Sequence, residues 1–463
     1  MNRAATIMGI VFFGLLAGFL FTAVPARSQD RGYDQRAQEA VAGLIRFNGL
    51  QGWVPGRPET WPESSSASST GGKTTRPTGG VSWDRSTRPA GLTGLILPNQ
   101  GLQLAADLSG LGALTQLDLS GNHLRDINLE GNFSLTELSA TKNKLGGLKL
   151  DGCPRLTRLA LSVNQIKTLE LSANPALREL AVSMNQLSAI DLGHNPELAV
   201  FEAMNNRLTD ISVTANPALT RLMLSYNQIS ELDLAFNPQL SELGIRDNGL
   251  RRLDLSHNPG LTELTASRNQ LTELNLAHSP HLAVLALDHN QLTRLDLSLA
   301  EALTHLSAQG NPLSEIIIGQ NQLENLVSLN LDDCRLPLSQ LAPLSGRAQN
   351  RARFGEQEPV LFTERKLALG ETLDLSDEAR LNGVETDFTV QTERKRRVPP
   401  EDYETADGLI IIKKPGRYLV RMTNEAVFSS EKNQSTKRTR TFKTKVYTGV
   451  IEVVAPPETD SPS

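Results

Sequence analysis

A leucine recurs every 21 residues through the middle of this 463-residue chain, and this period limits the possible folds more than any other feature. The series without insertion is Leu114, Leu135, Leu156, Leu177, Leu198, Leu219, Leu240, Leu261, Leu282 and Leu303. Each unit has two related halves, LxxLxLxxNxL and LxxLxLxxNPx, and atypical units begin at Leu92 and Leu326. Such a period predicts a solenoid in which each repeat forms one coil. We therefore expect a repeat solenoid of about twelve coils over residues 92–344.

The spacing of apolar residues inside one coil predicts two walls. In the first half, Leu264 and Ala266 alternate with Glu263 and Thr265. At period two the first pair faces the core and the second pair faces solvent, so the first halves are expected to form a ladder of short parallel strands. The second half has the same spacing at residues 274–276. We expect it to form a second row of strands on the opposite wall.

Asparagine recurs in two columns, each after a predicted strand where the chain must turn. The first column is Asn122, Asn143, Asn164, Asn185, Asn206, Asn227, Asn248, Asn269, Asn290 and Asn311. The second is Asn132, Asn174, Asn195, Asn216, Asn237, Asn258 and Asn321. A buried amide both donates and accepts, so each column is expected to satisfy backbone groups from coil to coil. Cys153 and Cys334 occupy two ladder positions in distant repeats, so we expect structural thiols and no disulfide.

These repeats resemble the leucine-rich-repeat family, in the 21-residue form of exported bacterial proteins related to the internalins. The resemblance covers residues 92 to about 344. It implies a β-solenoid that is flatter than a horseshoe with a helical outer wall. It also implies that the repeat sheet is a frame for recognition or adhesion, with specificity in the variable positions.

The first 28 residues are typical of a secretory signal peptide. Arg3 precedes an unbroken apolar stretch at residues 7–24, and the small residues Ala26 and Ser28 follow at the spacing that signal peptidase prefers. We expect cleavage there and no membrane span in the mature chain. A retained anchor is the alternative, because about 18 apolar residues can span a bilayer. The predicted location is secreted, at the cell surface or periplasmic.

Residues 29–91 are predicted to cap the solenoid. Ala37 to Phe47 has helical apolar spacing, and Trp53, Trp61 and Trp83 follow, with a flexible Ser- and Gly-rich insertion between the last two. This arrangement resembles the N-terminal cap of plant-type and many bacterial leucine-rich repeats. The tryptophans are expected to cover the first coil; a sugar-stacking platform is the alternative.

After Leu344 the repeat stops, and residues 345–357 are predicted to be a linker. Residues 358–455 contain separate alternating runs at 360–362, 372–375, 386–392, 409–412, 417–423 and 440–454. Such runs predict an all-β sandwich, followed by a polar tail at 456–463. The segment Gly416–Arg421 resembles the immunoglobulin-like strand that carries a tyrosine corner, with Val420 in place of the usual Cys. This implies an immunoglobulin-like domain.

Composition and motifs argue against catalysis. The net charge is −5, which does not favour nucleic-acid binding. We find no phosphate loop, no nucleophile elbow and no paired CxxC, and we expect neither an enzyme nor a cofactor. His257 and His278 fall in one solvent-facing column near Asp254, which makes them weak metal candidates. The same wall carries a column of acidic residues, for which a calcium role is the alternative to a solvated face.

The preferred ligand site is apolar. Most positions that flank the first strands hold small or polar residues, but the middle coils hold Val163, Met184, Met204, Met223 and Tyr226. Exposed Met and Tyr on a rigid sheet are typical of protein-binding surfaces, and Arg221 and Glu242 are expected to form a polar rim. The predicted function is a non-enzymatic protein-binding scaffold outside the cytoplasm; a glycan-binding surface protein is the alternative.

Overall fold

A computed structural model describes residues 36–37, 39–42, 80–84, 91–344, 352–354, 357, 360–381, 384–424, 427–432 and 439–455. The chain divides into two compact units, residues 1–208 and 209–463. It forms a β-solenoid of about twelve turns, which confirms the coil count predicted from the repeat. The signal peptide, Trp53, Trp61 and the polar tail lie outside the described residues. Among the described segments, no helix is long and apolar enough to cross a membrane.

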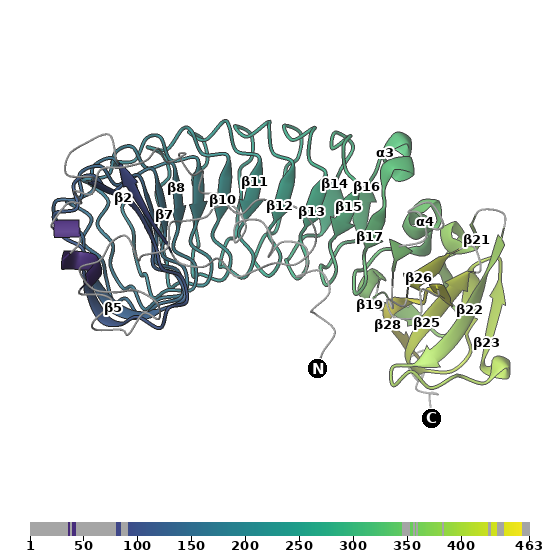
Figure 1. Cartoon of the computed structure of the whole chain (residues 1–463). Helices are drawn as coiled ribbons and strands as arrows, with labels where there is room; N and C mark the ends of the chain where they lie inside the picture. The colour runs from purple at the N-terminus through teal and green to yellow at the C-terminus, as the bar shows by residue number, and fades with distance from the viewer. Residues whose placement is uncertain are drawn as a thin grey trace, which may run out of the picture. The chain divides into compact units, whose positions relative to one another are not determined.

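In the first unit each coil contributes one short strand to a sheet (Figure 1). In sheet order the strands are β1 (Gly80–Asp84), β2 (Gly91–Ile96), β4 (Gln116–Asp118), β6 (Glu137–Ser139), β7 (Arg158–Ala160), β8 (Glu179–Ala181) and β9 (Val200–Glu202). β1 pairs antiparallel with β2, and the later neighbours pair parallel. Residues 37 and 39–42 of the predicted segment Ala37 to Phe47 are helical, as is Arg36 before it, and Arg36 donates to the Ser109 carbonyl at 2.9 Å.

The second unit continues the same one-strand-per-coil arrangement. Its strands are β10 (Arg221–Met223), β11 (Glu242–Gly244), β12 (Glu263–Thr265), β13 (Val284–Ala286), β15 (His305–Ser307), β17 (Ser328–Asn330) and β18 (Ala352–Arg353). Equivalent positions lie side by side, as in the pairing of Leu243 with Leu264. Leu264 and Ala266 are fully buried, whereas Glu263 and Thr265 are half-exposed. The predicted alternation is therefore confirmed.

The opposite wall differs from the prediction. Within residues 91–344, which the structure describes throughout, strands form there only in four coils: β3 (Gln103–Asp107) pairs with β5 (His123–Asn128), and β14 (Arg294–Asp296) pairs with β16 (Glu315–Ile317). In the other coils of this stretch the wall forms no strand, although Leu274 and Leu276 are buried as expected. Burial of a leucine requires only that the side chain face the core. The LxL spacing therefore fixed the inward positions but did not guarantee a hydrogen-bonded ladder.

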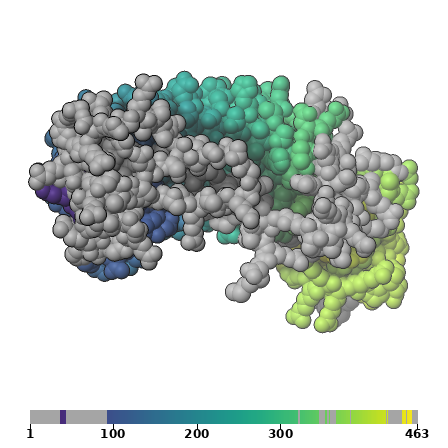
Figure 2. Space-filling view, viewed as in Figure 1, coloured from purple at the N-terminus to yellow at the C-terminus, as the bar shows by residue number. Residues whose placement is uncertain are grey.

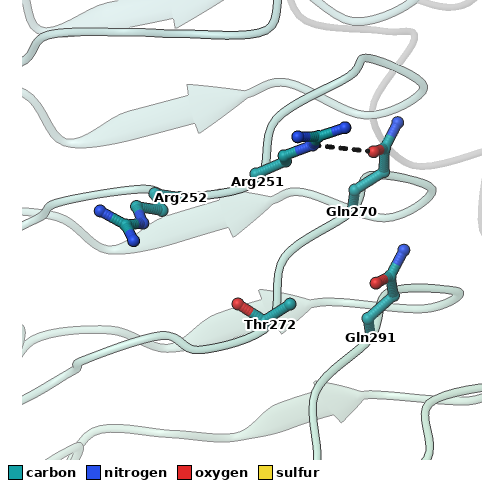
Figure 3. Close-up of a pocket in the computed structure, with 5 residues that line it drawn as sticks. All are labelled: Arg251, Arg252, Gln270, Thr272 and Gln291. Atoms are coloured by element: carbon teal, nitrogen blue, oxygen red, sulfur yellow. Dashed lines mark hydrogen bonds between the residues drawn. The ribbon is translucent and has the colours of Figure 1, made fainter.

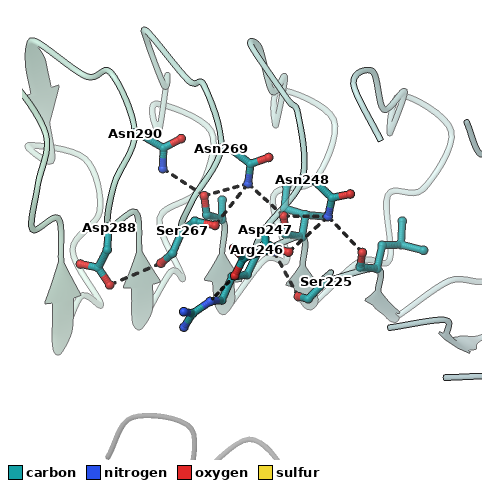
Figure 4. Close-up of polar contacts among 11 residues, drawn as sticks. Ser225, Arg246, Asp247, Asn248, Ser267, Asn269, Asp288 and Asn290 are labelled. Carbon is teal, nitrogen blue, oxygen red and sulfur yellow. Dashed lines mark hydrogen bonds and ion pairs between the residues drawn. The ribbon is translucent and has the colours of Figure 1, made fainter. Parts of the chain in front are cut away.

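The first asparagine column forms the predicted ladder. Asn269 accepts from the Leu250 N–H at 3.1 Å and donates to the carbonyls of Ile245 at 2.9 Å and Ala266 at 3.0 Å. Figure 4 shows the same pattern at Asn248 and Asn290. Each buried amide thus satisfies groups in its own coil and in the preceding one. This is why the same residue type recurs at one point of every coil.

The second column also joins successive coils. The Asn258 amide donates to Leu234 O at 3.2 Å and to Asn237 O at 2.9 Å. Asn321 was predicted for this column, but it lies in α3 (Gln320–Asn325). The neighbouring Gln322 is buried instead and donates to Leu297 O at 2.6 Å. The longer Gln side chain reaches the previous coil from a helical turn.

Both cysteines are buried and unpaired, as predicted. The Cys153 thiol contacts Leu129 O at 4.0 Å, and the Cys334 thiol contacts Ala308 O at 3.4 Å. Burial raises the pKa of Cys153 to about 11 and that of Cys334 to about 12. Neither thiol is available as a thiolate near neutral pH, which supports a structural role.

The ladder continues past Leu344 into the segment predicted to be a linker. β18 pairs parallel with β17. Gln357 is fully buried, donates to Leu331 O at 2.9 Å and accepts from the Leu336 N–H at 3.0 Å. Gln357 therefore makes the hydrogen bonds of a first-column asparagine, in the coil that follows Cys334. The helix α4 (Leu338–Leu341) lies in this last turn, and the Ser339 N–H donates to the Glu378 carboxylate at 2.9 Å.

The C-terminal residues form antiparallel-rich sheets that agree with most predicted strands. One sheet has the order β19 (Val360–Ala368), β28 (Val446–Val454), β25 (Gly416–Asn424), β22 (Val384–Thr392), β21 (Arg380–Leu381). Another has the order β20 (Thr372–Asp374), β24 (Leu409–Ile412), β23 (Tyr403–Ala406). β26 (Phe428–Lys432) pairs with β27 (Thr439–Lys443). The run predicted at 440–454 is two strands, and β21, β23 and β26 were not predicted.

Candidate functional site

One residue in nearly every coil adopts a left-handed backbone conformation just before the first-column asparagine. In the first unit these are Lys142, Val163, Met184 and Asn205, with φ of 58°, 61°, 57° and 56°. In the second unit they are Tyr226, Asp247, Arg268 and His289, with φ of 62°, 52°, 57° and 54°. We name these positions the left-handed column. The conformation costs a non-glycine residue roughly 1–2 kcal/mol, and the cost is greatest for a β-branched residue such as Val163.

The turn itself explains this conformation. The left-handed residue donates its N–H to the next coil, as Val163 does to Ser183 O at 2.8 Å, and the following asparagine then points its amide inward. Gly121 and Gly310 occupy the same place in outer coils, with φ of 69° and 68°. Glycine is the unstrained solution there. Non-glycine residues at this position in the middle coils therefore lower the stability of the fold relative to glycine.

In the first unit the left-handed column carries two residues of the predicted apolar site, Val163 and Met184, and Met204 lies next to the column. Met184 is 45% exposed, and Val163 and Met204 are half-buried. The Met184 N–H donates to Met204 O at 2.7 Å, which places these residues in adjacent coils. Beside them, Arg158 and Glu179 form an ion pair at 2.7 Å on the strands. The structure thus brings Val163, Met184 and Met204 together, and we call them the Met184 patch.

Met223 is a correction to the predicted site. It was expected to face solvent, but its side chain is only 3% exposed. The reason lies in the next coil, where Gly244 has no side chain. A Cβ at Gly244 would lie 2.5 Å from the Met223 sulfur, so the thioether occupies the space that a larger residue would fill. Met223 is therefore removed from the candidate contact residues.

Tyr226 forms a different surface in the second unit. It is half-buried, and the Arg246 guanidinium lies 5.8 Å from the centroid of its ring. Arg246 also pairs with Asp247 at 2.9 Å (Figure 4). Arg221 and Glu242 pair with each other across β10 and β11, as a polar rim requires. A cation over an aromatic face is attracted electrostatically to the ring.

Sequence reasoning missed Arg246, Asp247 and Asp288. Asp288 accepts from the Gln309 N–H at 3.0 Å, from the Ser307 hydroxyl and from the Ser267 hydroxyl, the last of which is drawn in Figure 4. The available signal was positional, because Asp247 lies one place before a ladder asparagine, and Arg246 and Asp288 lie two places before one. A search limited to apolar residues passed over them.

A polar hollow lies where the chain turns into the second half-coil. Arg251, Arg252, Gln270, Thr272 and Gln291 line it, and Arg251 donates to the Gln270 amide oxygen at 3.3 Å (Figure 3). All five are exposed. With no buried polar group aimed into it, the hollow offers no preorganised chemistry.

The acidic wall has a structural explanation. Asp254 accepts from the Ser256 N–H at 2.9 Å, and Asp191, Asp233 and Asp296 accept equivalently from the N–H two residues later. The backbone hydrogen bond from Ser256 holds the pKa of Asp254 below its ordinary value. His257, by contrast, contacts the Ser256 hydroxyl at 3.0 Å. Among the described residues, no three His, Cys, Asp or Glu side chains are grouped to hold a metal, so His257, His278 and Asp254 do not form such a site.

Relief of strain in the left-handed column gives a testable prediction. Val163→Gly should raise the free energy of unfolding by about 0.5 kcal/mol, because relief of roughly 1–2 kcal/mol of strain at φ of 61° exceeds the roughly 0.5–1 kcal/mol of chain entropy that glycine loses on folding. The control is Val200→Gly, which lies in β9 and should lose about 0.5–1 kcal/mol. Urea denaturation of both variants would test this. A Val163→Gly protein less stable than wild type would contradict the assignment of strain.

No model of a known protein family matches this chain, and no curated protein matches it. Among solved structures this chain is similar to the functional domain of InlJ from Listeria monocytogenes, which includes a cysteine ladder. The two sequences are 21% identical, the match covers 78% of this chain and 91% of that chain, and the TM-score is 0.43. It is also similar to YopM, a leucine-rich effector protein from Yersinia pestis, at 27% identity over 58% and 79%, with a TM-score of 0.46.

A third similar structure is a leucine-rich-repeat protein from Leptospira interrogans, at 23% identity over 59% of this chain and 86% of that one, with a TM-score of 0.43. All three are bacterial repeat proteins. Their TM-scores are below 0.5, so no residue's role is carried over from them.

Proposed function

We propose that this chain is a non-enzymatic scaffold that binds another protein through the Met184 patch. One observation carries the proposal: Met184 is 45% exposed, and the half-buried Val163 and Met204 lie beside it in adjacent coils. Exposed methionine is suited to protein contacts because its side chain is flexible and polarisable.

The remaining parts of the chain fit a protein that acts outside the cytoplasm. Residues 1–28 are typical of a secretory signal. Both cysteines are buried, which supports a structural rather than a redox role. We propose that residues 358–455 are an immunoglobulin-like module. In support, the Tyr418 hydroxyl donates to the carbonyl of Lys414 at 3.1 Å, as in a tyrosine corner, and Val420 is fully buried. Recognition or adhesion is the role we assign to the whole chain.

A capture experiment tests the proposal. Full-length protein and a Met184→Asp variant would each be used to retain proteins from envelope and host-cell extracts, followed by mass spectrometry. We expect at least one protein to be retained by wild type and reduced at least about tenfold by Met184→Asp, because a buried unpaired carboxylate is costly. Phe133→Asp is the matched control, since Phe133 is 61% exposed and lies outside the patch. Equal retention by all three proteins would reject the patch.

A further inference from the structure

Four basic residues follow one another at the turn after β22, in the C-terminal domain that Figures 1 and 2 colour yellow-green. Arg394, Lys395, Arg396 and Arg397 are all exposed. Like charges at this density repel one another, so the turn raises the energy of the folded domain unless something else compensates. We call these four residues the basic turn.

The backbone of the basic turn is fixed by local hydrogen bonds. The Lys395 N–H donates to Thr392 O at 2.7 Å, and the Thr392 N–H donates to Arg396 O at 2.7 Å. The Arg396 N–H donates to the Thr392 hydroxyl at 3.2 Å, and Gln391 pairs with Arg397 as an isolated bridge. Lys395 takes the left-handed conformation, with φ of 56°. The cations are thus presented by a preorganised loop, which lowers the ordering cost of binding.

Three acidic residues near the basic turn are paired with other cations. Glu393 pairs with Arg417 at 3.0 Å, Asp402 with Lys414 at 2.7 Å, and Glu404 with Lys413 at 2.7 Å. Within the part of the chain that the structure describes, no carboxylate pairs with Arg394, Arg396 or Arg397. Arg394, Arg396 and Arg397 are therefore a local concentration of positive charge, although the whole chain is acidic.

We propose that the basic turn binds a sulfated or phosphorylated polysaccharide. Guanidinium groups match the geometry of sulfate and phosphate oxygens and can form paired hydrogen bonds to them. The turn offers several such groups within a few residues, which suits a polymer with closely spaced anions. No residue of the Met184 patch takes part, so this proposal is independent of the function proposed above.

The surroundings of the turn disfavour two other polyanions. Single-stranded nucleic acid is held by bases stacked on exposed aromatic rings, but residues 393–400 contain none. The nearby Tyr447 is only 6% exposed, and the Lys395 ammonium lies 4.5 Å from its ring centroid. Membrane-surface segments add buried apolar side chains to their charge. The adjacent Val398 is 4% exposed and already packed in the domain.

The test is equilibrium binding of the full chain to dextran sulfate, with neutral dextran of equal length as the reference. The variant R394Q/R396Q/R397Q removes three cations and leaves Lys395 on Tyr447. The matched control K366Q/R380Q/K413Q also removes three exposed cations, each of which pairs with a carboxylate in the same domain. Binding would be measured at several salt concentrations, with circular dichroism to show that each variant is folded.

We expect wild type to bind dextran sulfate and not dextran. The basic-turn variant should lose at least about tenfold in affinity, and the slope of log affinity against log salt should fall by about 2 as fewer counterions are released. The control should stay within about twofold of wild type, because its cations are already neutralised. Equal binding by the two triple variants, or none by wild type, would overturn the proposal. So would variant-sensitive binding to single-stranded DNA or phosphatidylglycerol vesicles without binding to dextran sulfate.

Discussion

Asn269→Ala should lower the free energy of unfolding by about 3–5 kcal/mol, because it leaves the buried Leu250 N–H without a partner and removes two further buried hydrogen bonds. The Asn269 amide accepts from Leu250 N–H and donates to the carbonyls of Ile245 and Ala266, all in the interior of the coil. Asn269 is 7% exposed, so water does not readily replace it. The carbonyls of Ile245 and Ala266 still accept from Asn248 and Asn290, so the largest part of the loss is the desolvation cost of the Leu250 N–H.

Asn275→Ala is the matched control, since it is the same substitution in the same repeat. Asn275 is exposed and accepts only from the Ala277 N–H at 3.0 Å, so its removal should cost under about 1 kcal/mol. Urea denaturation followed by circular dichroism would compare the two midpoints. If they coincided, the ladder would not be the element that holds the coils together.

Phe201→Ala should destabilise the first unit by about 3–5 kcal/mol, the usual cost of a large cavity in a packed core. Phe201 is fully buried on β9 and lies beside Leu180 of β8, at a position where other coils carry leucine. The coil accommodates the ring in place of the usual side chain. Neighbouring coils are held in register by their strands and amides, so they cannot collapse freely into the space.

Phe201→Leu provides the comparison for this prediction. It restores the residue that most coils use at this point and leaves a much smaller gap, so the loss should be under about 1.5 kcal/mol. Thermal and urea unfolding of both variants would give the difference. A Phe201→Leu protein as unstable as Phe201→Ala would contradict the view that cavity size sets the cost.

The periodic parts of the fold were predictable because one physical requirement repeats in every coil. Inward leucines and ladder asparagines are needed at fixed spacing, so their positions could be found from sequence. Gln322 and Gln357 were missed because they differ in residue type from the ladder asparagines. At irregular turns their longer amide side chains donate to a carbonyl of the preceding coil, as the asparagines do. The second wall was mispredicted because burial of Leu274 and Leu276 does not require strand pairing.

The candidate site was only partly predictable. Exposure of Met184 follows from its position in the coil, but burial of Met223 depends on Gly244 in the next coil, which a single-repeat pattern does not reveal. The left-handed column was missed because its members share a backbone conformation rather than a residue type. Lys142, Val163 and Asp247 have no side-chain property in common, yet all have positive φ.

Site-specific photo-crosslinking tests the central claim most directly. A photoreactive phenylalanine analogue would replace Met184 in one protein and Phe133 in another, and each would be irradiated in host-cell and envelope extracts. Both positions are exposed, but only Met184 lies in the proposed binding patch. We predict a discrete protein adduct at position 184 and none at position 133. An adduct only at position 133, or no adduct at either, would contradict the assignment of the Met184 patch as a protein-binding surface.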